Sequence, residues 1–333
     1  MTVSTRQPFS INLLKLDPRH ESERISSWIK SSVQNNLHRR GVVVGISGGI
    51  DSSVVAALCV NALGSQRVLG VLLPEEESSP ESRQLALELA GQLGIETVIE
   101  DITGALKGAG CYERRDQAIQ RIIPQFEKGW KSKITLPGSL LEEQTLNVFY
   151  LSVISPQGEE ITRRIPPAEF MQIMAASNFK QRTRMAMLYY HAERNGYAVV
   201  GTANKNEHDL GFFVKYGDGG VDLNPIVHLF KSQVYQLARY LNIPEEIQQR
   251  PPTSDTYSAG STQEEFFFRL PFEVLDLIWF GYEEGFSAEE IAITLGLTDE
   301  QVNRVIQDIL QKKRTTEYLR TLPLRLSPTN NAI

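Results

Sequence analysis

The chain has 333 residues, of which 34 are Lys or Arg and 40 are Asp or Glu, so its formal net charge is −6. A hydrophobic fraction of 41% and a charged fraction of 22% exclude disordered, collagen-like and low-complexity chains. The acidic balance argues against nucleic acid as a partner, and the two cysteines give neither a disulfide framework nor a zinc signature. No apolar run reaches the ~18 residues of a membrane span, and no signal peptide is evident, so we expect a cytoplasmic protein without membrane contact.

Apolar periodicity predicts alternating helices and strands in the first hundred residues. The Val42–Val44 run between two glycines is typical of a parallel strand that is buried on both faces. The alternation predicts an α/β fold with a doubly wound, mostly parallel sheet flanked by helices. The expected elements are a helix over 20–40, a strand over 42–44, a helix over 54–63, a strand over 67–73, a helix over 80–93 and a strand over 96–99.

Residues 104–165 interrupt this alternation, and we interpret them as a β-rich insertion within a single domain over 1–333. Pro156-Gln157-Gly158 separates two β-like runs of the insertion and predicts a hairpin. Further along we expect a helix over 167–194, a strand over 197–201, a Gly-rich loop over 215–225, a helix over 231–241, a mobile polar loop with an aromatic end over 250–270 and a helical C-terminal extension over 272–320.

The sequence Gly-Ile-Ser-Gly-Gly-Ile-Asp-Ser-Ser at 45–53 lies directly between an expected strand and an expected helix. Gly48 and Gly49 allow a tight turn that approaches a ligand closely, and the N–H groups at the helix start favour an anion. The lysine of a Walker A loop is absent, and the pattern is not GxGxxG. Asp51 lies in the first helical turn, where it can share Mg²⁺ with phosphate oxygens or merely complement the helix dipole.

This glycine turn resembles the signature of the ATP pyrophosphatase (PP-loop) superfamily, whose fold is described as adenine nucleotide alpha hydrolase-like. The resemblance implies that the turn binds the pyrophosphate end of ATP. It also implies cleavage between the α- and β-phosphates, with an adenylated intermediate. The residues of the turn that are expected to bind ATP are Gly45, Ile46, Ser47, Gly48, Gly49, Ile50, Asp51 and Ser52.

Five further segments resemble ammonia-dependent NAD synthetases and occur in that family's order. They are NFKQRTRM at 178–185, VGTANKNE at 200–207, GFFVKYGDGGVD at 211–222, LFKSQ at 229–233 and PPT at 251–253. The resemblance implies that Glu207 holds Mg²⁺ together with Asp51, and that Thr202, Lys231 and Thr253 contact ATP. Glu207 follows an expected strand, where parallel sheets place their ligands, but taken alone it can also be a solvated loop residue.

The same resemblance implies a second group of residues, which hold deamido-NAD: Arg182, Lys215, Asp222, Lys312 and Lys313. An arginine can form two hydrogen bonds to a phosphate or carboxylate, although Arg182 can equally belong to the polar face of a helix.

Two features depart from the family pattern. Residues 264–269 carry an aromatic run, Phe266–Phe268, where the family has an acidic stretch, and the 104–165 insertion is longer than the compact ammonia-dependent enzymes lead us to expect.

The function implied by the resemblance is the ATP-dependent amidation of deamido-NAD by ammonia in a homodimer. It releases AMP and pyrophosphate and requires no catalytic nucleophile from the protein. Cys59 lies in an apolar helical stretch and is expected to be buried, so we expect free ammonia or a separate partner that supplies it. Two alternatives stay open: a superfamily ligase that adenylates a different carboxylic acid, and a nucleotide-binding sensor without turnover. The presence of both Asp51 and Glu207 argues against the sensor.

Overall fold

The computed structural model describes residues 7–142, 148–254 and 258–326. Its central sheet has four strands in the order β3-β2-β1-β7: β1 (Val42–Gly45), β2 (Val68–Leu72), β3 (Glu96–Ile99) and β7 (Ala198–Val200). All neighbouring strands are parallel, and Val43 lies opposite both Leu69 and Val199. The predicted parallel α/β sheet is therefore confirmed.

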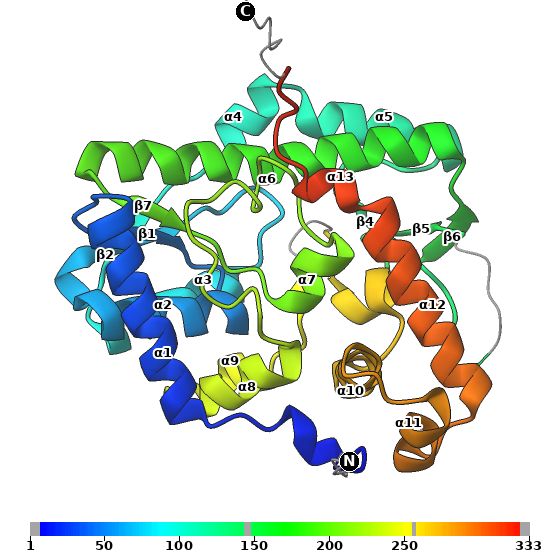
Figure 1. Ribbon diagram of the computed structural model, residues 1–333. Helices are drawn as coiled ribbons and strands as arrows, with labels where there is room; N and C mark the ends of the chain where they lie inside the picture. The colour runs from blue at the N-terminus through cyan, green and yellow to red at the C-terminus, as the bar shows by residue number, and fades with distance from the viewer. Residues whose placement is uncertain (1–6, 143–147, 255–257, 327–333) are drawn as a thin grey trace, which may run out of the picture.

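Helices cover both faces of this sheet, as a doubly wound fold requires (Figure 1). On one face, α2 (Ile50–Leu63) and α3 (Pro80–Leu93) pack against the strands, and α1 (Pro18–Ser31) and α8 (Lys231–Tyr240) pack on α2 in the same core. The other face packs against α6 (Pro167–Asn195), which contributes Ala192 and Leu188 to a small core with Val43 and Val199. The sheet is apolar on both sides because it is covered on both sides.

Two predicted helices have different bounds in the structure. The first begins at Pro18, where the Asp17 side chain accepts hydrogen bonds from the N–H groups of Arg19 and His20, and it ends at Ser31. A π-helical turn, η2 (Ser32–Asn36), continues it. The predicted 54–63 helix already begins at Ile50, which places Asp51 in its first turn, beside the glycines. Short 3₁₀ turns are η1 (Ile11–Leu14) and η3 (Ser65–Arg67).

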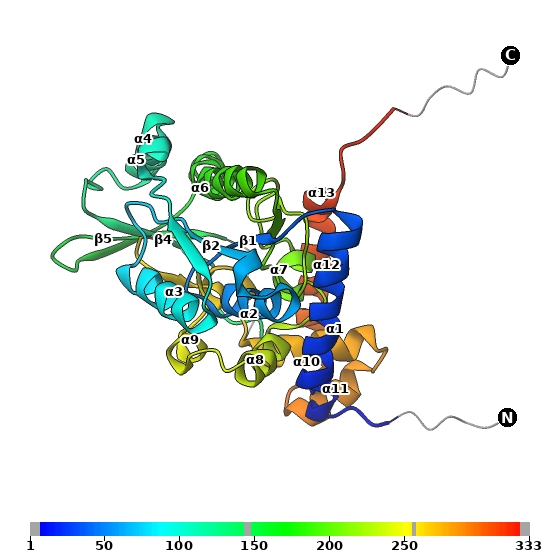
Figure 2. The ribbon, with the colours of Figure 1, turned by 90° about the vertical axis from the view of Figure 1, so that its left-hand side faces the viewer.

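The described residues of the 104–165 range contribute two helices and a separate antiparallel sheet. The helices are α4 (Thr103–Gly108) and α5 (Cys111–Ile122), and the strands are β4 (Lys131–Thr135), β5 (Tyr150–Ile154) and β6 (Glu160–Arg164). The predicted hairpin is confirmed, since β5 and β6 are antiparallel and Gly158 between them has φ +88°. Helix α5 packs along α6, and Figure 2 shows β4 and β5 on the opposite side of the molecule from α1.

The C-terminal part is helical, as predicted, and builds a second core. Its helices are α10 (Phe272–Glu283), α11 (Ala288–Leu295), α12 (Asp299–Thr315) and α13 (Glu317–Arg320), and α7 (Lys205–Leu210) packs against α12. Within the described ranges, no helix combines the length and hydropathy that a bilayer crossing needs.

The segment expected to be a mobile polar loop over 250–270 differs from that expectation at its aromatic end. It follows α9 (Glu245–Gln249) and contains β8 (Thr253–Ser254), β9 (Ser261–Thr262) and a π-helical turn, η4 (Glu264–Phe268). Phe266 and Phe268 are buried, and both pack against Phe212 with ring centroids 6.0 and 5.5 Å away. The aromatic run belongs to the core because these rings find partners that are distant in sequence.

Candidate active site

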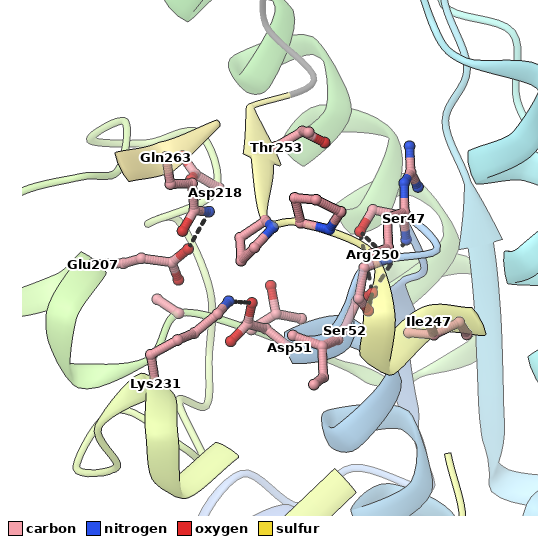
Figure 3. Close-up of a pocket in the computed structure, with 16 residues that line it drawn as sticks. Ser47, Asp51, Ser52, Glu207, Asp218, Lys231, Ile247, Arg250, Thr253 and Gln263 are labelled. Atoms are coloured by element: carbon pink, nitrogen blue, oxygen red, sulfur yellow. Dashed lines mark hydrogen bonds and ion pairs between the residues drawn. The ribbon is translucent and has the colours of Figure 1, made fainter. Parts of the chain in front are cut away.

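A pocket lies at the edge of the sheet where the parallel strands end (Figure 3). Ser47 and Asp51 enter it from the glycine turn, Glu207 from α7 and Lys231 from α8, while Thr253 and Gln263 close it from the opposite side. Eight of the predicted ATP residues line this pocket: Ser47, Gly49, Ile50, Asp51, Ser52, Thr202, Lys231 and Thr253. Gly45 and Ile46 line a larger cavity next to it.

The backbone of the glycine turn is fixed by its own residues. Gly48 has φ +76°, and a Cβ at this position would lie 2.3 Å from the carbonyl oxygen of Ser82 at the start of α3. The hydroxyls of Ser52 and Ser53 donate to the carbonyl of Gly49 at 3.0 and 2.8 Å. The N-cap residue of α2 is Gly49, which has no side chain with which to cap the helix. The turn therefore presents a helix N-terminus whose first N–H groups are available to an anion.

The buried ammonium of Lys231 and the partly buried carboxylate of Asp51 form an ion pair in the pocket. The Asp51 carboxylate pairs with the Lys231 ammonium through Oδ2 and accepts a hydrogen bond from Asn204 Nδ2 through Oδ1, at 3.0 Å. Lys231 is 0% exposed. Burial opposes its charge, but Asp51 and Glu207 together raise the pKa of Lys231, so the site keeps a fixed positive charge.

Glu207 is held by the turn that begins α7. Its carboxylate accepts from the N–H of Asn204 at 3.2 Å, and the Asn204 side chain accepts from the N–H of Glu207 at 3.1 Å, which is a capping box. Gln263 Nε2 donates to the other carboxylate oxygen at 3.0 Å. Burial, and after it the charge of Asp51, raise the pKa of Glu207 to about 8. Two carboxylates thus share this site with one ammonium.

This donor set suits a hard divalent cation. Mg²⁺ is commonly held by one or two carboxylates together with substrate phosphates, and a cation would relieve the repulsion that raises the pKa of Glu207. The described part of the chain contains no cluster of three or more His, Cys, Asp or Glu side chains that could hold a metal by themselves. The remaining ligands of such an ion would therefore come from a bound nucleotide and water.

A second layer of contacts fixes α7 against α8. The N–H of Lys231 donates to Asn206 Oδ1 at 3.0 Å, and Asn206 Nδ2 donates to Asp276 Oδ1 at 2.6 Å. The N–H of Ser232 donates to the other oxygen of Asp276 at 2.8 Å. Asp276 is 0% exposed, and burial raises its pKa to about 6. Sequence reasoning missed this layer because its members are polar residues in three separate elements.

The larger cavity opens from the same place. It shares Ser47, Thr202, Glu207, Asp218, Thr253 and Gln263 with the smaller pocket. One face of α6, including Phe170, forms a wall, and Phe149, Phe212, Phe266 and Phe267 line part of the rest. The shared residues mark a junction where two bound molecules can meet.

Asp218 is the acidic residue at this junction that sequence reasoning missed. Its carboxylate accepts from the N–H of Val214 at 2.7 Å, and burial raises its pKa to about 6. Asn204, Arg250 and Gln263 were missed as well. Asn204 and Asp218 lie within segments that resemble the family, but nothing in a single sequence separates them from their polar neighbours.

The five residues predicted to hold deamido-NAD lie outside both cavities in the described part of the chain. Arg182 Nε donates to the carbonyl of Lys215 at 3.3 Å, and Lys215 Nζ donates to the carbonyls of Tyr318 and Thr321 at 2.8 and 2.7 Å. Asp222 accepts from the hydroxyl of Tyr189 at 3.1 Å.

The two predicted lysines of α12 face other parts of the C-terminal core. Lys312 Nζ donates to the carbonyl of Phe267 at 2.7 Å and pairs with Asp308 at 2.6 Å. Lys313 Nζ lies 3.5 Å from Glu283. The structure therefore gathers the predicted ATP and metal residues but does not bring the predicted deamido-NAD residues to the junction.

A parallel sheet with a glycine turn, an acidic pair and a buried lysine at its carboxyl edge defines a nucleotide-binding α/β protein. The model of the family described as NAD synthase matches residues 21–126 and 139–323, so the chain belongs to the NAD synthase family. The two matched ranges leave out residues 127–138, which include β4.

Curated relatives are similar over nearly the whole chain. The NH(3)-dependent NAD(+) synthetase of Mesorhizobium japonicum is 49% identical over 312 residues, which cover 94% of this chain and 98% of that protein. The protein of the same name from Rhizobium rhizogenes is 46% identical over 327 residues and covers 98% of each chain. The NH3-dependent NAD synthetase of Campylobacter jejuni, solved with nitrate, has a TM-score of 0.61 and 25% identity over 94% of this chain and all of that chain.

Proposed function

We propose that this chain converts deamido-NAD, ATP and ammonia to NAD, AMP and pyrophosphate. The observation that carries the proposal is the meeting of Asp51, Glu207 and Lys231 at the glycine turn, because this arrangement suits a departing pyrophosphate. The curated relatives support the choice of acceptor and nitrogen source, since both carry the name NH(3)-dependent NAD(+) synthetase and align over almost their entire length.

The triphosphate of ATP binds at the glycine turn in this proposal. The N–H groups at the start of α2 and the Lys231 ammonium face its negative charge, and Thr202 and Thr253 contact the nucleotide. Asp51 and Glu207 would hold Mg²⁺, which neutralises phosphate charge when it is bound. Positioning and charge neutralisation are the main means by which a protein speeds phosphoryl and nucleotidyl transfer.

The first half-reaction takes place at the junction of the two cavities. The carboxylate of the acceptor attacks the α-phosphorus of ATP, which forms an acyl–O–P bond and breaks the bond to the β-phosphate oxygen. Lys231 and the turn N–H groups stabilise the charge that develops on the leaving pyrophosphate. The buried surroundings strengthen these interactions, because water does not screen them.

In the second half-reaction ammonia attacks the acyl carbon, and AMP leaves. Asp218 accepts the proton that the attacking nitrogen loses, a role that suits a carboxylate whose pKa is raised to about 6. No protein nucleophile takes part. Cys59 is buried and burial raises its pKa to about 12, while the Cys111 thiol donates to the carbonyl of Ala176. Ammonia is free or comes from a separate partner.

We further propose a cytoplasmic homodimer built of single-domain subunits. Helix α6 exposes Met171, Phe179 and Tyr190, which are 70%, 38% and 53% accessible and are suitable for a subunit contact. The predicted deamido-NAD residues then contact the part of the dinucleotide that extends beyond the cavities. Sedimentation analysis with Met171→Ser tests this contact, and a parent that sediments as a monomer would refute it.

The decisive experiment supplies the protein with MgATP, deamido-NAD and ammonium chloride and measures NAD, AMP and pyrophosphate. We expect equal amounts of the three products, and no NAD when glutamine replaces ammonium. The Asp51→Asn variant serves as the control and should make NAD far more slowly than the parent at the same Mg²⁺ concentration. A panel of other carboxylic acids tests the alternative acceptor: AMP formation with another acid but not with deamido-NAD would overturn the proposal. ATP binding without AMP formation under any condition would favour the sensor.

A further inference from the structure

A cluster of buried charged side chains lies behind the larger cavity, outside the residues proposed to bind substrates. Glu75 and Glu77 enter it from the segment between β2 and α3, Arg115 and Tyr112 enter from α5, and Lys180 enters from α6. Lys180 is 1% exposed, Glu75 5% and Arg115 7%. Charged side chains are rarely buried to this degree unless they are paired.

Every charge in the cluster has an opposite partner. Lys180 Nζ donates to Glu75 Oε1 at 3.1 Å and to Glu77 Oε2 at 2.6 Å. Arg115 Nη1 donates to both oxygens of Glu77, at 2.7 and 2.6 Å. The hydroxyl of Tyr112 donates to Glu75 Oε2 at 2.6 Å. Burial alone would raise the pKa of Glu77, but Lys180 and Arg115 hold it below its usual range.

The middle glutamate of the same segment is a natural internal comparison. Glu76 pairs with Lys107 at 2.7 Å, but their side chains are 44% and 58% exposed. Exposed pairs of this kind contribute little because water and salt screen them. Of three consecutive glutamates, the outer two are thus fixed inside the protein and the middle one faces solvent.

The buried pairs fix the course of the backbone at the cavity wall. The N–H of Ser78 donates to the carbonyl of Glu75 at 2.9 Å, and the N–H of Glu75 donates to Ser78 Oγ at 3.0 Å, which closes a tight turn. Pro74, Ser78 and Ser79 of this segment line the larger cavity. The carboxylates of Glu75 and Glu77 are anchored to α5 and α6, while the turn itself borders the space for a ligand.

The same segment leads directly to the glycine turn. Helix α3 begins at Pro80, and the carbonyl of Ser82 occupies the place where a Cβ of Gly48 would lie. Ser82 Oγ also accepts from Arg250 Nη2 at 2.8 Å, and Arg250 lines the smaller pocket. A shift of the 74–79 segment would therefore move α3 against both the glycine turn and Arg250.

We propose that Lys180 is a positioning residue for ATP. It acts through Glu75 and Glu77 to hold the 74–79 segment as a preformed wall of the larger cavity, which the predicted ATP residues Gly45, Ile46 and Ser47 also line. Buried ion pairs add little net stability, because the loss of hydration offsets their attraction, so a fixed geometry is the benefit that the cluster provides. The inference rests on the proposed function in that ATP is the ligand. It also gives α5 a role in a site that it does not touch.

The test measures the dissociation constant of ATP by calorimetry without an acceptor, and the kinetic constants separately. Lys180→Met should weaken ATP binding by about tenfold or more, while kcat at saturating ATP stays within about threefold. Tyr112→Phe loses one hydrogen bond and no charge, and it should weaken ATP binding about two- to fivefold. The control Lys107→Met removes the exposed pair with Glu76 and should bind ATP like the parent.

A charge-balanced double variant separates positioning from stability. Lys180→Met with Glu75→Gln leaves Glu77 paired with Arg115, so its melting temperature should lie nearer to that of the parent than the single variant's does. Its ATP affinity should stay weak. Parental affinity in either folded lysine variant overturns the proposal, and if neither folds, parental affinity in Tyr112→Phe overturns it. If the parent binds ATP but makes no NAD, the proposed function is refuted, while the comparison of ATP affinities still tests the role of Lys180.

Discussion

Removal of the Lys231 ammonium is expected to lower both the stability and the activity of the protein. Lys231 is 0% exposed, and its substitution by methionine leaves Asp51 and Glu207 as partly buried carboxylates without the cation that pairs with Asp51. Loss of one partner of a buried ion pair costs about 3–5 kcal/mol. An unfolding entropy of ~2.1 cal/mol/K per residue gives about 0.7 kcal/mol/K for 333 residues, so the melting temperature should fall by about 4–7 °C.

The same substitution should disable the acidic pair. Lys231 lowers the pKa of Glu207, which burial and Asp51 hold at about 8, so its loss raises that pKa further. A carboxyl group with a raised pKa holds its proton to higher pH, so Glu207 is then harder to ionise when a cation binds. With no ammonium for the leaving pyrophosphate either, kcat for AMP formation should fall by about 10²–10³.

A double-mutant cycle with Lys231→Met and Asp51→Asn measures the coupling. Thermal unfolding of the four proteins without nucleotide should show that the double variant is less destabilised than the sum of the single variants. The control Lys30→Met removes an exposed ammonium of α1 and should change neither the melting temperature nor the rate. A Lys231→Met protein that melts with the parent, or forms AMP at more than about a third of the parental rate, would refute the reasoning.

Three further predictions concern the same site. Gly48→Ala should weaken ATP binding about tenfold or more in a titration, because its Cβ would meet Ser82. The control Gly64→Ala has a similar φ, +82°, but its Cβ would meet no atom of the described residues within 4 Å, so this variant should retain affinity. At constant free ammonia, kcat/KM should fall below about pH 6, because the carboxylate of Asp218, with its raised pKa, becomes protonated there. Asp218→Asn should react about 10²–10⁴ slower and should not show this decrease at low pH. An unchanged decrease in the variant would contradict the role of Asp218. A chelator should stop AMP formation reversibly. Asp51→Asn should need about tenfold more Mg²⁺ than the parent for a half-maximal rate. If the variant needs no more Mg²⁺ than the parent, Asp51 is not a Mg²⁺ ligand.

The sheet and the glycine turn could be predicted because their determinants are local. Val42–Val44 are all 0% exposed, as an apolar run between glycines indicates, and the turn follows that strand directly. The meeting of Asp51, Glu207 and Lys231 is different, because 180 residues separate Asp51 from Lys231. Only the family resemblance joined them, since no periodicity links residues that distant in sequence.

Other features depend on partners that a single sequence does not reveal. Phe266 and Phe268 were expected at the end of a mobile loop, but both are buried because they pack against Phe212. Lys180 has the sequence context of a polar helix position, yet Glu75, 105 residues earlier, makes its burial possible. The predicted deamido-NAD residues lie outside the cavities. In our proposal, a second subunit completes the binding site to which they belong.

The most direct test of the central claim follows the oxygen atoms of the acceptor. Deamido-NAD labelled with ¹⁸O in its carboxylate is turned over with MgATP and ammonia, and the products are analysed by mass spectrometry. Attack of that carboxylate on the α-phosphorus predicts one labelled oxygen in AMP and none in pyrophosphate. Label in inorganic phosphate or pyrophosphate, or the accumulation of ADP in place of AMP, would contradict the account.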